Sequence, residues 1–208
     1  MKLTKITLAI SVLATGLCYA QSPAESRLGQ GLLGERYTEL GFGLDDIRHV
    51  SDHGYSVETG ANDPIIPGLL DAGASYSYSW IRGPFRGHAN TIGAYATAYS
   101  RFERVKPFVS TALGYQWTST RFGSDEQTLW GLATGVEIPA GAVTITPRIS
   151  YADDFENTQN SSQAWTFQTE VNYWVNRTTA LFGSIGKSDV RRSSIDSWNY
   201  QVGLRARF

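Results

Sequence analysis

The sequence has almost no cysteine and comparatively little charge, and both shortages exclude classes of protein. Its single cysteine, Cys18, lies in a segment that we expect to be removed, so neither a disulfide scaffold nor a thiol enzyme is expected. Charged residues make up 18% of the chain, below the roughly 25% of soluble proteins. Lysine and arginine number 18 against 19 acidic residues. A nucleic-acid partner is therefore not expected, because it would call for a basic excess.

Long hydrophobic runs are also scarce. One run, residues 6–17, follows Lys2 and Lys5 and precedes Ala20. This is the pattern of a secretory signal peptide, which has a short basic end, an apolar centre of about 12 residues and a small residue at the cleavage site. No other stretch approaches the ~20 apolar residues that a membrane-spanning helix needs. We therefore expect an exported chain from which the signal peptide is cleaved after Ala20.

The remaining chain divides into a short polar part and a long patterned part. Residues 21–34 are polar and glycine-rich, which predicts a flexible periplasmic arm or a small plug. From residue 35 to 208 apolar residues alternate with small or polar ones, as in strands with one apolar and one polar face. This alternation predicts strands at 38–44, 54–66, 69–80, 88–102, 108–117, 128–138, 143–151, 165–175, 178–186 and 198–208. The expected domains are thus a signal peptide at 1–20, the arm at 21–34 and a β-domain at 35–208.

The connections between these strands fall into two alternating classes. Tight turns are expected at 67–68, 103–104, 139–141 and 176–177, and longer polar loops at 48–53, 82–87, 119–125, 154–162 and 188–195. An even strand count with both chain ends on the short-turn side is typical of bacterial outer-membrane barrels. The predicted fold class is all-β, a closed antiparallel transmembrane β-barrel of ten strands, with eight as the alternative.

Two details of the strands are open. In the stretch 88–102, Ile92 and the alternate alanines compete with Tyr95 and Tyr99 for the outer face. Pro147 falls inside an expected strand, where it removes one hydrogen bond of the ladder. Because a closed barrel has no edge strand to accept a proline, we expect a β-bulge at Pro147.

A water-soluble barrel would show the same period with its apolar face turned inward, so the residue types must decide between water and lipid. The polar face consists mostly of Gly, Ser, Thr, Asn and Gln, which suits a crowded polar lumen. Aromatic residues are expected to form girdles at two levels, as at the two interfaces of a bilayer. The outer girdle is predicted to be Trp80, Trp117, Trp130, Trp165 and Trp198, and the inner group Phe102, Phe108, Tyr173, Trp174 and Phe208. We therefore expect the chain to lie in the cell outer membrane.

Three stretches resemble those of known outer-membrane proteins. The terminal YQVGLRARF resembles the C-terminal β-signal that the barrel-assembly machinery recognises, which would be carried by Tyr200, Val202, Leu204, Ala206 and Phe208. The stretches VKPFVSTALGYQW and WGLATGVEIPAG resemble strands of small OmpA-like or porin-family outer-membrane β-barrel proteins. The resemblance implies a barrel from Tyr37 to Phe208, inserted by that machinery, with outer-membrane lipid and lipopolysaccharide as its surroundings.

The function is less determined, and two readings concern the lumen. Charges of both signs are expected there: Glu39, Asp71, Glu137 and Glu170 against Arg101, Arg148, Arg205 and Arg207. Buried charges must be paired or hydrated. If these charges pair with one another, their side chains fill a narrow barrel. The protein would then have a structural, membrane-integrity or surface-interaction role. Alternatively they would line a narrow porin-like channel, widened by inward glycines such as Gly41, Gly73, Gly135 and Gly203.

The third reading is an enzyme at the outer rim. Asp45-Asp46 and Asp153-Asp154 end two expected strands, with His49 and His53 nearby, and such a cluster could act as a general base on water. Ten-stranded omptin proteases are similar in outline. The favoured interpretation is that these aspartates begin loops by bonding to the local backbone. We therefore expect no catalytic, metal-binding or cofactor-binding residues, and the sequence names no surface ligand.

Overall fold

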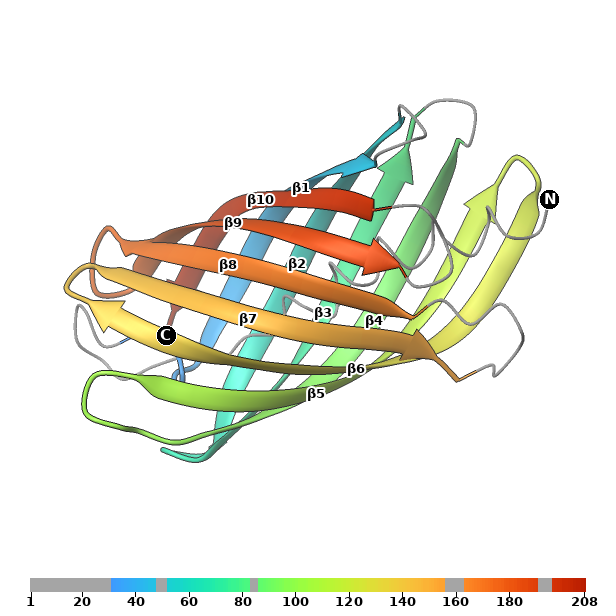
Figure 1. Ribbon diagram of the computed structural model, residues 1–208. Helices are drawn as coiled ribbons and strands as arrows, with labels where there is room; N and C mark the ends of the chain where they lie inside the picture. Colours follow the sequence, from blue (N-terminus) through green and yellow to red (C-terminus); the bar gives the residue numbers. More distant parts are fainter. Residues whose placement is uncertain (1–30, 48–51, 83–85, 156–162, 191–195) are drawn as a thin grey trace.

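The computed structural model describes residues 31–47, 52–82, 86–155, 163–190 and 196–208. They form a closed barrel of antiparallel strands (Figure 1). The strands are β1 (Tyr37–Ile47), β2 (Asp52–Ile66), β3 (Leu70–Ile81), β4 (Gly87–Tyr99), β5 (Lys106–Thr120), β6 (Gly123–Ala140), β7 (Val143–Asp154), β8 (Ala164–Trp174), β9 (Thr179–Val190) and β10 (Asp196–Arg207). Over the ranges described, no helix is long and apolar enough to cross a membrane. The predicted signal peptide and most of the predicted arm lie outside the described residues.

Each strand pairs with its neighbours in the chain, and β1 pairs with β10 to close the ring. The closing ladder runs without interruption from Tyr37 opposite Arg207 to Ile47 opposite Ser197. Closure satisfies the backbone groups that an edge strand would expose, which is what a lipid environment requires. The predicted all-β barrel of ten strands is confirmed, and the alternative of eight strands is wrong.

The tight turns lie where the sequence predicted them, at the end drawn on the left in Figure 1. Gly68 and Gly141 occupy the β2–β3 and β6–β7 turns with φ of 84° and 65°, a region in which glycine avoids the steric cost of a Cβ atom. In the β8–β9 turn the Asn176 side chain accepts hydrogen bonds from the amides of Thr178 and Thr179, each at 2.8 Å. These local signals bring consecutive strands together as hairpins.

One outer connection differs from its prediction. Residues 119–125, expected to form a loop, instead extend the ladder to Thr120 opposite Gly123, so that only Arg121 and Phe122 form the turn. This β5–β6 hairpin projects at the right of Figure 1. Its residues lack an apolar face because both faces of a projecting hairpin meet water, and alternation therefore gave no signal of a strand there.

The alternation sets which side chains face lipid and which face the interior. The five predicted girdle tryptophans, Trp80, Trp117, Trp130, Trp165 and Trp198, face outward in the halves of their strands nearer the outer connections. The Tyr151 ring joins two of them, with centroids 5.5 Å from Trp130 and 5.0 Å from Trp165. In β4, Ile92 faces outward, whereas Tyr95 and Tyr99 are buried inside.

Two aromatic residues and one proline depart from expectation. Phe108 and Trp174, predicted in the inner girdle, are buried inside the barrel, because the period of two gives them the inward face of Ser110 and Asn172. Pro147 causes no bulge: the β6–β7 ladder omits the pairs of Pro147 and Thr146 and resumes in the same register. The register shifts instead beside Pro64, at the end of β2, where a proline interrupts a ladder that is about to turn.

Candidate functional site: the barrel interior

The sequence-predicted lumen charges lie in two groups inside the barrel, with one exception. Arg205, Glu39, Glu170 and Arg148 form one buried group, and Asp71 and Glu137, also buried, form a second group that binds residues 31–34. Arg207 faces inward at the turn end, where its Nε lies 2.8 Å from a Glu35 carboxylate oxygen.

Arg101 is the exception, since it is exposed in the β4–β5 turn. Its placement in the lumen was wrong because β4 ends at Tyr99. Beyond the end of a strand, alternation no longer determines which way a side chain points.

Arg205 on β10 is the centre of the first group. Its Nε donates to Glu39 on β1 at 2.7 Å, and its Nη1 and Nη2 donate to the two oxygens of Glu170 on β8 at 2.5 and 3.0 Å. Nη1 also donates to Asn172 Oδ1 at 2.6 Å. Glu170 in turn accepts from Asn172 Nδ2 at 2.7 Å. The guanidinium thus joins three strands through charge-assisted hydrogen bonds, which are shorter and stronger than neutral ones.

Aromatic rings cover the faces of this guanidinium. The Arg205 Cζ lies 4.3 Å from the centroid of the Phe182 ring and 5.6 Å from that of the Tyr37 ring. Such contacts add cation–π attraction to the ion pairs and keep water from the planar faces. The arginine therefore fills space in the barrel as well as carrying charge.

The inward glycines make room for these rings. A Cβ atom at Gly203 would overlap the Phe182 ring, one at Gly73 would overlap the Tyr95 ring, and one at Gly135 would approach the Phe108 ring. Aromatic side chains folded over glycines on neighbouring strands are a recurrent packing device in β-barrels. The glycines at these positions thus accommodate rings rather than leave the lumen wider.

Residues 31–34 of the predicted arm enter the turn end of the barrel. The amides of Leu32 and Leu33 donate to the Glu137 carboxylate on β6, and the Gly34 amide donates to Asp71 on β3 at 3.1 Å. Lys106 on β5 binds the same Glu137 at 3.0 Å and donates to the Leu33 carbonyl at 3.3 Å. The two acidic side chains therefore hold this segment by its backbone.

The two leucines of this segment complete the closure by apolar packing. Leu32 packs with Trp174 and Ala180, and Leu33 packs with Tyr99 and Phe108. Both leucines are almost fully buried. Of the predicted arm or small plug over 21–34, residues 31–34 thus lie inside the barrel, as a small plug would, and residues 21–30 lie outside the described residues.

Polar side chains that bond to one another line the half of the interior nearer the outer loops. Asn199 donates to Asp45 at 2.7 Å and accepts from Ser188 at 2.8 Å. On the other wall, Gln116 donates to Thr91 at 2.9 Å and accepts from Gln127 at 2.8 Å. These bonds join neighbouring strands and add rigidity to the wall.

The aspartates that suggested a rim enzyme are not brought together. Asp45 faces inward, whereas its neighbour Asp46 faces outward, 3.7 Å from His53 Nδ1. Asp153 accepts from the Tyr151 hydroxyl at 2.8 Å, on β7, which is separated from β1 by other strands on both sides. His49 lies outside the described residues. Within the ranges that the structure describes, no group of His, Cys, Asp and Glu could hold a metal ion.

Sequence reasoning missed several interior residues that matter as much as those it named. Lys106 was not assigned, although the alternation through Phe108 and Ser110 gives it the inward face. Glu58 on β2 was missed as well and is buried beside Gln201, whose Nε2 donates to it at 3.4 Å. The weak alternation of β2 concealed that position, because small and polar residues occupy both faces of the strand.

Comparisons with known proteins show the fold. No protein-family model matches the chain, and no curated protein matches it. Among solved structures, the translocator domain of the autotransporter NalP from Neisseria meningitidis covers all of both chains at 10% identity with a TM-score of 0.57. Neisserial surface protein A is 16% identical over 83% of this chain and 96% of its own, with a TM-score of 0.44. The KdgM porin is 11% identical over 82% of this chain and 99% of its own, also with a TM-score of 0.44. The chain therefore has the fold of outer-membrane β-barrels.

Proposed function

We propose that the protein is a non-catalytic barrel of the cell outer membrane that serves membrane integrity or surface interaction and does not conduct solutes. Its outward face supports the membrane assignment. Large apolar side chains such as Phe42, Val109, Phe167 and Val202 are more than half exposed, and they recur on most of the strands. Soluble monomers rarely expose contiguous apolar surface beyond a few hundred Å², whereas a lipid-facing wall requires it.

The proposal that the barrel does not conduct solutes is supported by the group of side chains around Arg205. One guanidinium bonds to carboxylates from β1 and β8 and is stacked against rings of Phe182 and Tyr37. A barrel of about eight strands has an interior just wide enough for side chains, whereas porins of 16–18 strands leave an aqueous channel. With ten strands and residues 31–34 packed into one end, the side chains themselves close the interior.

The conductance of the refolded protein in a planar bilayer tests this proposal. We expect no discrete current steps, because no ion can pass the Arg205 group without breaking several charge-assisted hydrogen bonds. Insertion is verified separately by the mobility of the unheated protein on a denaturing gel. Discrete steps that change in Arg148→Gln or Glu137→Gln would overturn the closed state and make the protein a narrow channel.

We further propose that β10 and the terminal Phe208 carry the signal read by the barrel-assembly machinery, formed by Tyr200, Val202, Leu204, Ala206 and Phe208. Except for Ala206, these side chains are large, apolar and at least 40% exposed, as a strand that is recognised from its lipid side requires. Phe208 itself is 74% exposed. Its side chain therefore contributes little to the packing of the finished barrel.

Replacing Phe208 with alanine is accordingly expected to reduce outer-membrane insertion several-fold while leaving export and the stability of the inserted fraction unchanged. The matched control is Phe102→Ala, which removes a ring that is 61% exposed at the same turn end of the barrel. Fractionation of cells, followed by quantification of folded protein in the outer membrane, measures the effect. Equal insertion of the two variants would show that Phe208 is not part of an assembly signal.

A further inference from the structure

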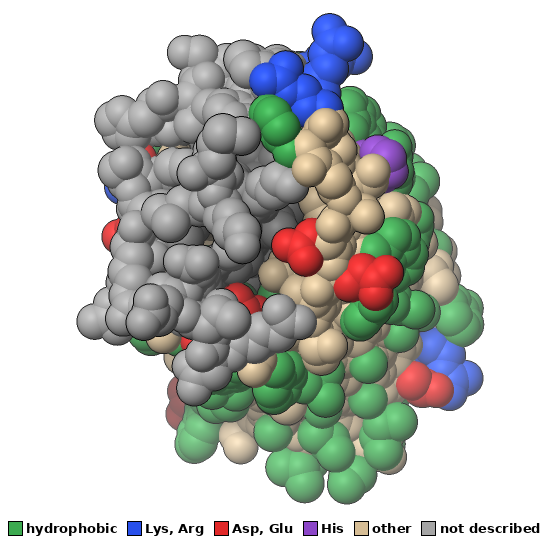
Figure 2. All heavy atoms as spheres, turned by 90° about the vertical axis from the view of Figure 1, so that its right-hand side faces the viewer, with side chains coloured by type: hydrophobic (Ala, Val, Ile, Leu, Met, Phe, Trp, Pro, Cys, Tyr) green, Lys and Arg blue, Asp and Glu red, His purple; other side chains and the backbone are tan. Residues whose placement is uncertain are grey.

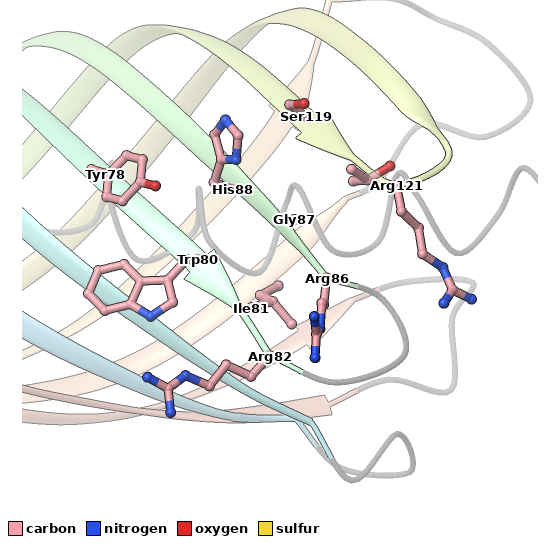
Figure 3. A pocket seen from close by; sticks show the side chains of 10 residues that line it. Tyr78, Trp80, Ile81, Arg82, Arg86, Gly87, His88, Ser119 and Arg121 are labelled. Atoms are coloured by element: carbon pink, nitrogen blue, oxygen red, sulfur yellow. The ribbon is translucent and has the colours of Figure 1, made fainter.

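A cavity of about 640 Å³ lies at the outer ends of β3, β4 and β5. Figure 3 shows the side chains that line it, which come from these three strands and the residues just beyond their ends. They are Tyr78, Trp80, Ile81, Arg82, Arg86, Gly87, His88, Ser119, Thr120 and Arg121. The group combines three arginines and one histidine with aromatic rings, and it includes no acidic residue.

The strand pairing brings the outer ends of β3, β4 and β5 together, and the three arginines lie next to those ends. Trp80 on β3 lies opposite His88 on β4, and His88 lies opposite Ser119 on β5. Arg82, Arg86 and Arg121 lie directly next to the outer ends of β3, β4 and β5, and all three line the cavity. The Arg121 amide donates to the Arg86 carbonyl at 3.4 Å, which ties the last two together.

Among the described residues, the three arginines have no acidic partner: none of Arg82, Arg86 and Arg121 forms an ion pair there. By contrast, Lys187 at the outer end of β9 pairs with Asp196 at 3.0 Å. Figure 2, which looks onto this end of the barrel, shows basic side chains gathered at one edge beside hydrophobic ones.

Aromatic rings lie directly below the arginines, on the side of the bilayer core. The centroid of the Trp80 ring is 5.8 Å from those of both Tyr78 and Tyr55, and the Arg82 guanidinium lies 5.4 Å from the Tyr55 ring. Tyrosine and tryptophan at this level mark the boundary between acyl chains and headgroups. The arginines just beyond them therefore lie at the depth of lipid phosphates.

We propose that Arg82, Arg86 and Arg121 form a binding site for the phosphate groups of a phosphorylated lipid in the outer leaflet. The proposal rests on the outer-membrane placement proposed above. Arginine presents a planar fork of donors that binds phosphate oxygens in pairs, and three adjacent forks match a headgroup that carries more than one phosphate. Trp80 and Tyr78 would contact the sugar or acyl portion below, so the cavity recognises both ends of an amphiphile.

The test titrates diphosphoryl lipid A into the detergent-solubilised, folded protein and follows tryptophan fluorescence, since Trp80 lines the site. The wild type is compared with Arg82→Gln/Arg86→Gln/Arg121→Gln. The matched control is Arg101→Gln/Arg104→Gln/Arg177→Gln, which removes the same charge from exposed arginines in the tight turns at the opposite end. Dephosphorylated lipid A and inorganic phosphate serve as the two comparison ligands.

We expect the rim triple variant to bind diphosphoryl lipid A at least tenfold more weakly than the wild type and the control variant to bind it as the wild type does. Equal binding by all three proteins, or equal binding of the dephosphorylated lipid, would overturn the phosphate site. If inorganic phosphate saturates the site at the same concentration as diphosphoryl lipid A, the site binds free phosphate rather than a lipid headgroup. Insertion into vesicles is measured independently. A barrel that inserts but binds the phosphorylated and dephosphorylated lipids equally refutes this site alone. A barrel that fails to insert refutes the proposed membrane placement.

Discussion

Replacement of Arg205 with alanine is expected to lower the free energy of unfolding by about 3–5 kcal/mol, the usual effect of removing one member of a buried ion-paired group. Arg205 is 1% exposed, and Glu170 is fully buried. The substitution leaves the carboxylates of Glu39 and Glu170 without their counter-charge in an interior where a lone charge is strongly unfavourable. It also removes the contact that fills the space between the Phe182 and Tyr37 rings.

Urea unfolding of the barrel in lipid vesicles, followed by tryptophan fluorescence, measures this loss. The control is Arg36→Ala, which breaks a 2.8 Å ion pair with Asp63 whose side chains are 53% and 48% exposed, and which should cost below about 1 kcal/mol. The combined variant Glu39→Gln/Glu170→Gln/Arg205→Met should recover much of the loss, because it removes all the charges together. A loss for Arg205→Ala no larger than that of the control would show that the group does not hold the strands together.

This group also marks the boundary of what the sequence could predict. Alternation was sufficient to assign Glu39, Glu170 and Arg205 to the inner face, because a strand with one apolar face has its other face fixed. It could not show that they meet. Arg205 lies 166 positions from Glu39 and 35 from Glu170 in the chain, and their contact depends on the stagger of strands around the ring.

The inward glycines show the same limit of sequence-based prediction. The alternation predicted that these glycines face inward. A lumen widened by the empty space beside them was one prediction that agreed with that pattern. The structure fills that space with Phe182 and Tyr95 from neighbouring strands, because a ring on one strand can bend over a glycine on the next. Single-strand patterns do not contain this information, since it concerns the rotamers of residues on another strand.

At the ends of strands, the alternation of apolar and polar residues gave wrong predictions for a different reason. Arg101 was assigned inward by counting past the end of β4, and residues 119–125 were assigned to a loop because they lack an apolar face. Both errors lie outside the lipid-facing band, the only zone in which one face must be apolar. The outer rim, which the sequence described least well, is also where the three arginines of the proposed phosphate site lie.

The second large effect concerns the segment 31–34. Replacing Glu137 with alanine is expected to release this segment, because the carboxylate accepts hydrogen bonds from the amides of Leu32 and Leu33 and pairs with Lys106. A hydrogen bond to a charged group contributes about 1.5–3 kcal/mol, and each 1.4 kcal/mol is a factor of ten in an equilibrium. We therefore expect the released state to become at least tenfold more populated.

The measurement is the rate at which a maleimide labels a cysteine introduced at Leu33, whose side chain is buried against Tyr99 and Phe108. The only native cysteine, Cys18, lies in the predicted signal peptide, so it is absent from protein refolded from residue 21 onward. The rate in Leu33→Cys/Glu137→Ala should exceed that in Leu33→Cys alone by at least tenfold. The control is Leu33→Cys/Glu58→Ala, since Glu58 is equally buried but bonds to Gln201 rather than to the segment. If both glutamate variants label at the same rate, the Glu137 carboxylate is not what anchors the segment, and the anchor must lie in the hydrogen bonds of Asp71 and Lys106 and in the apolar packing.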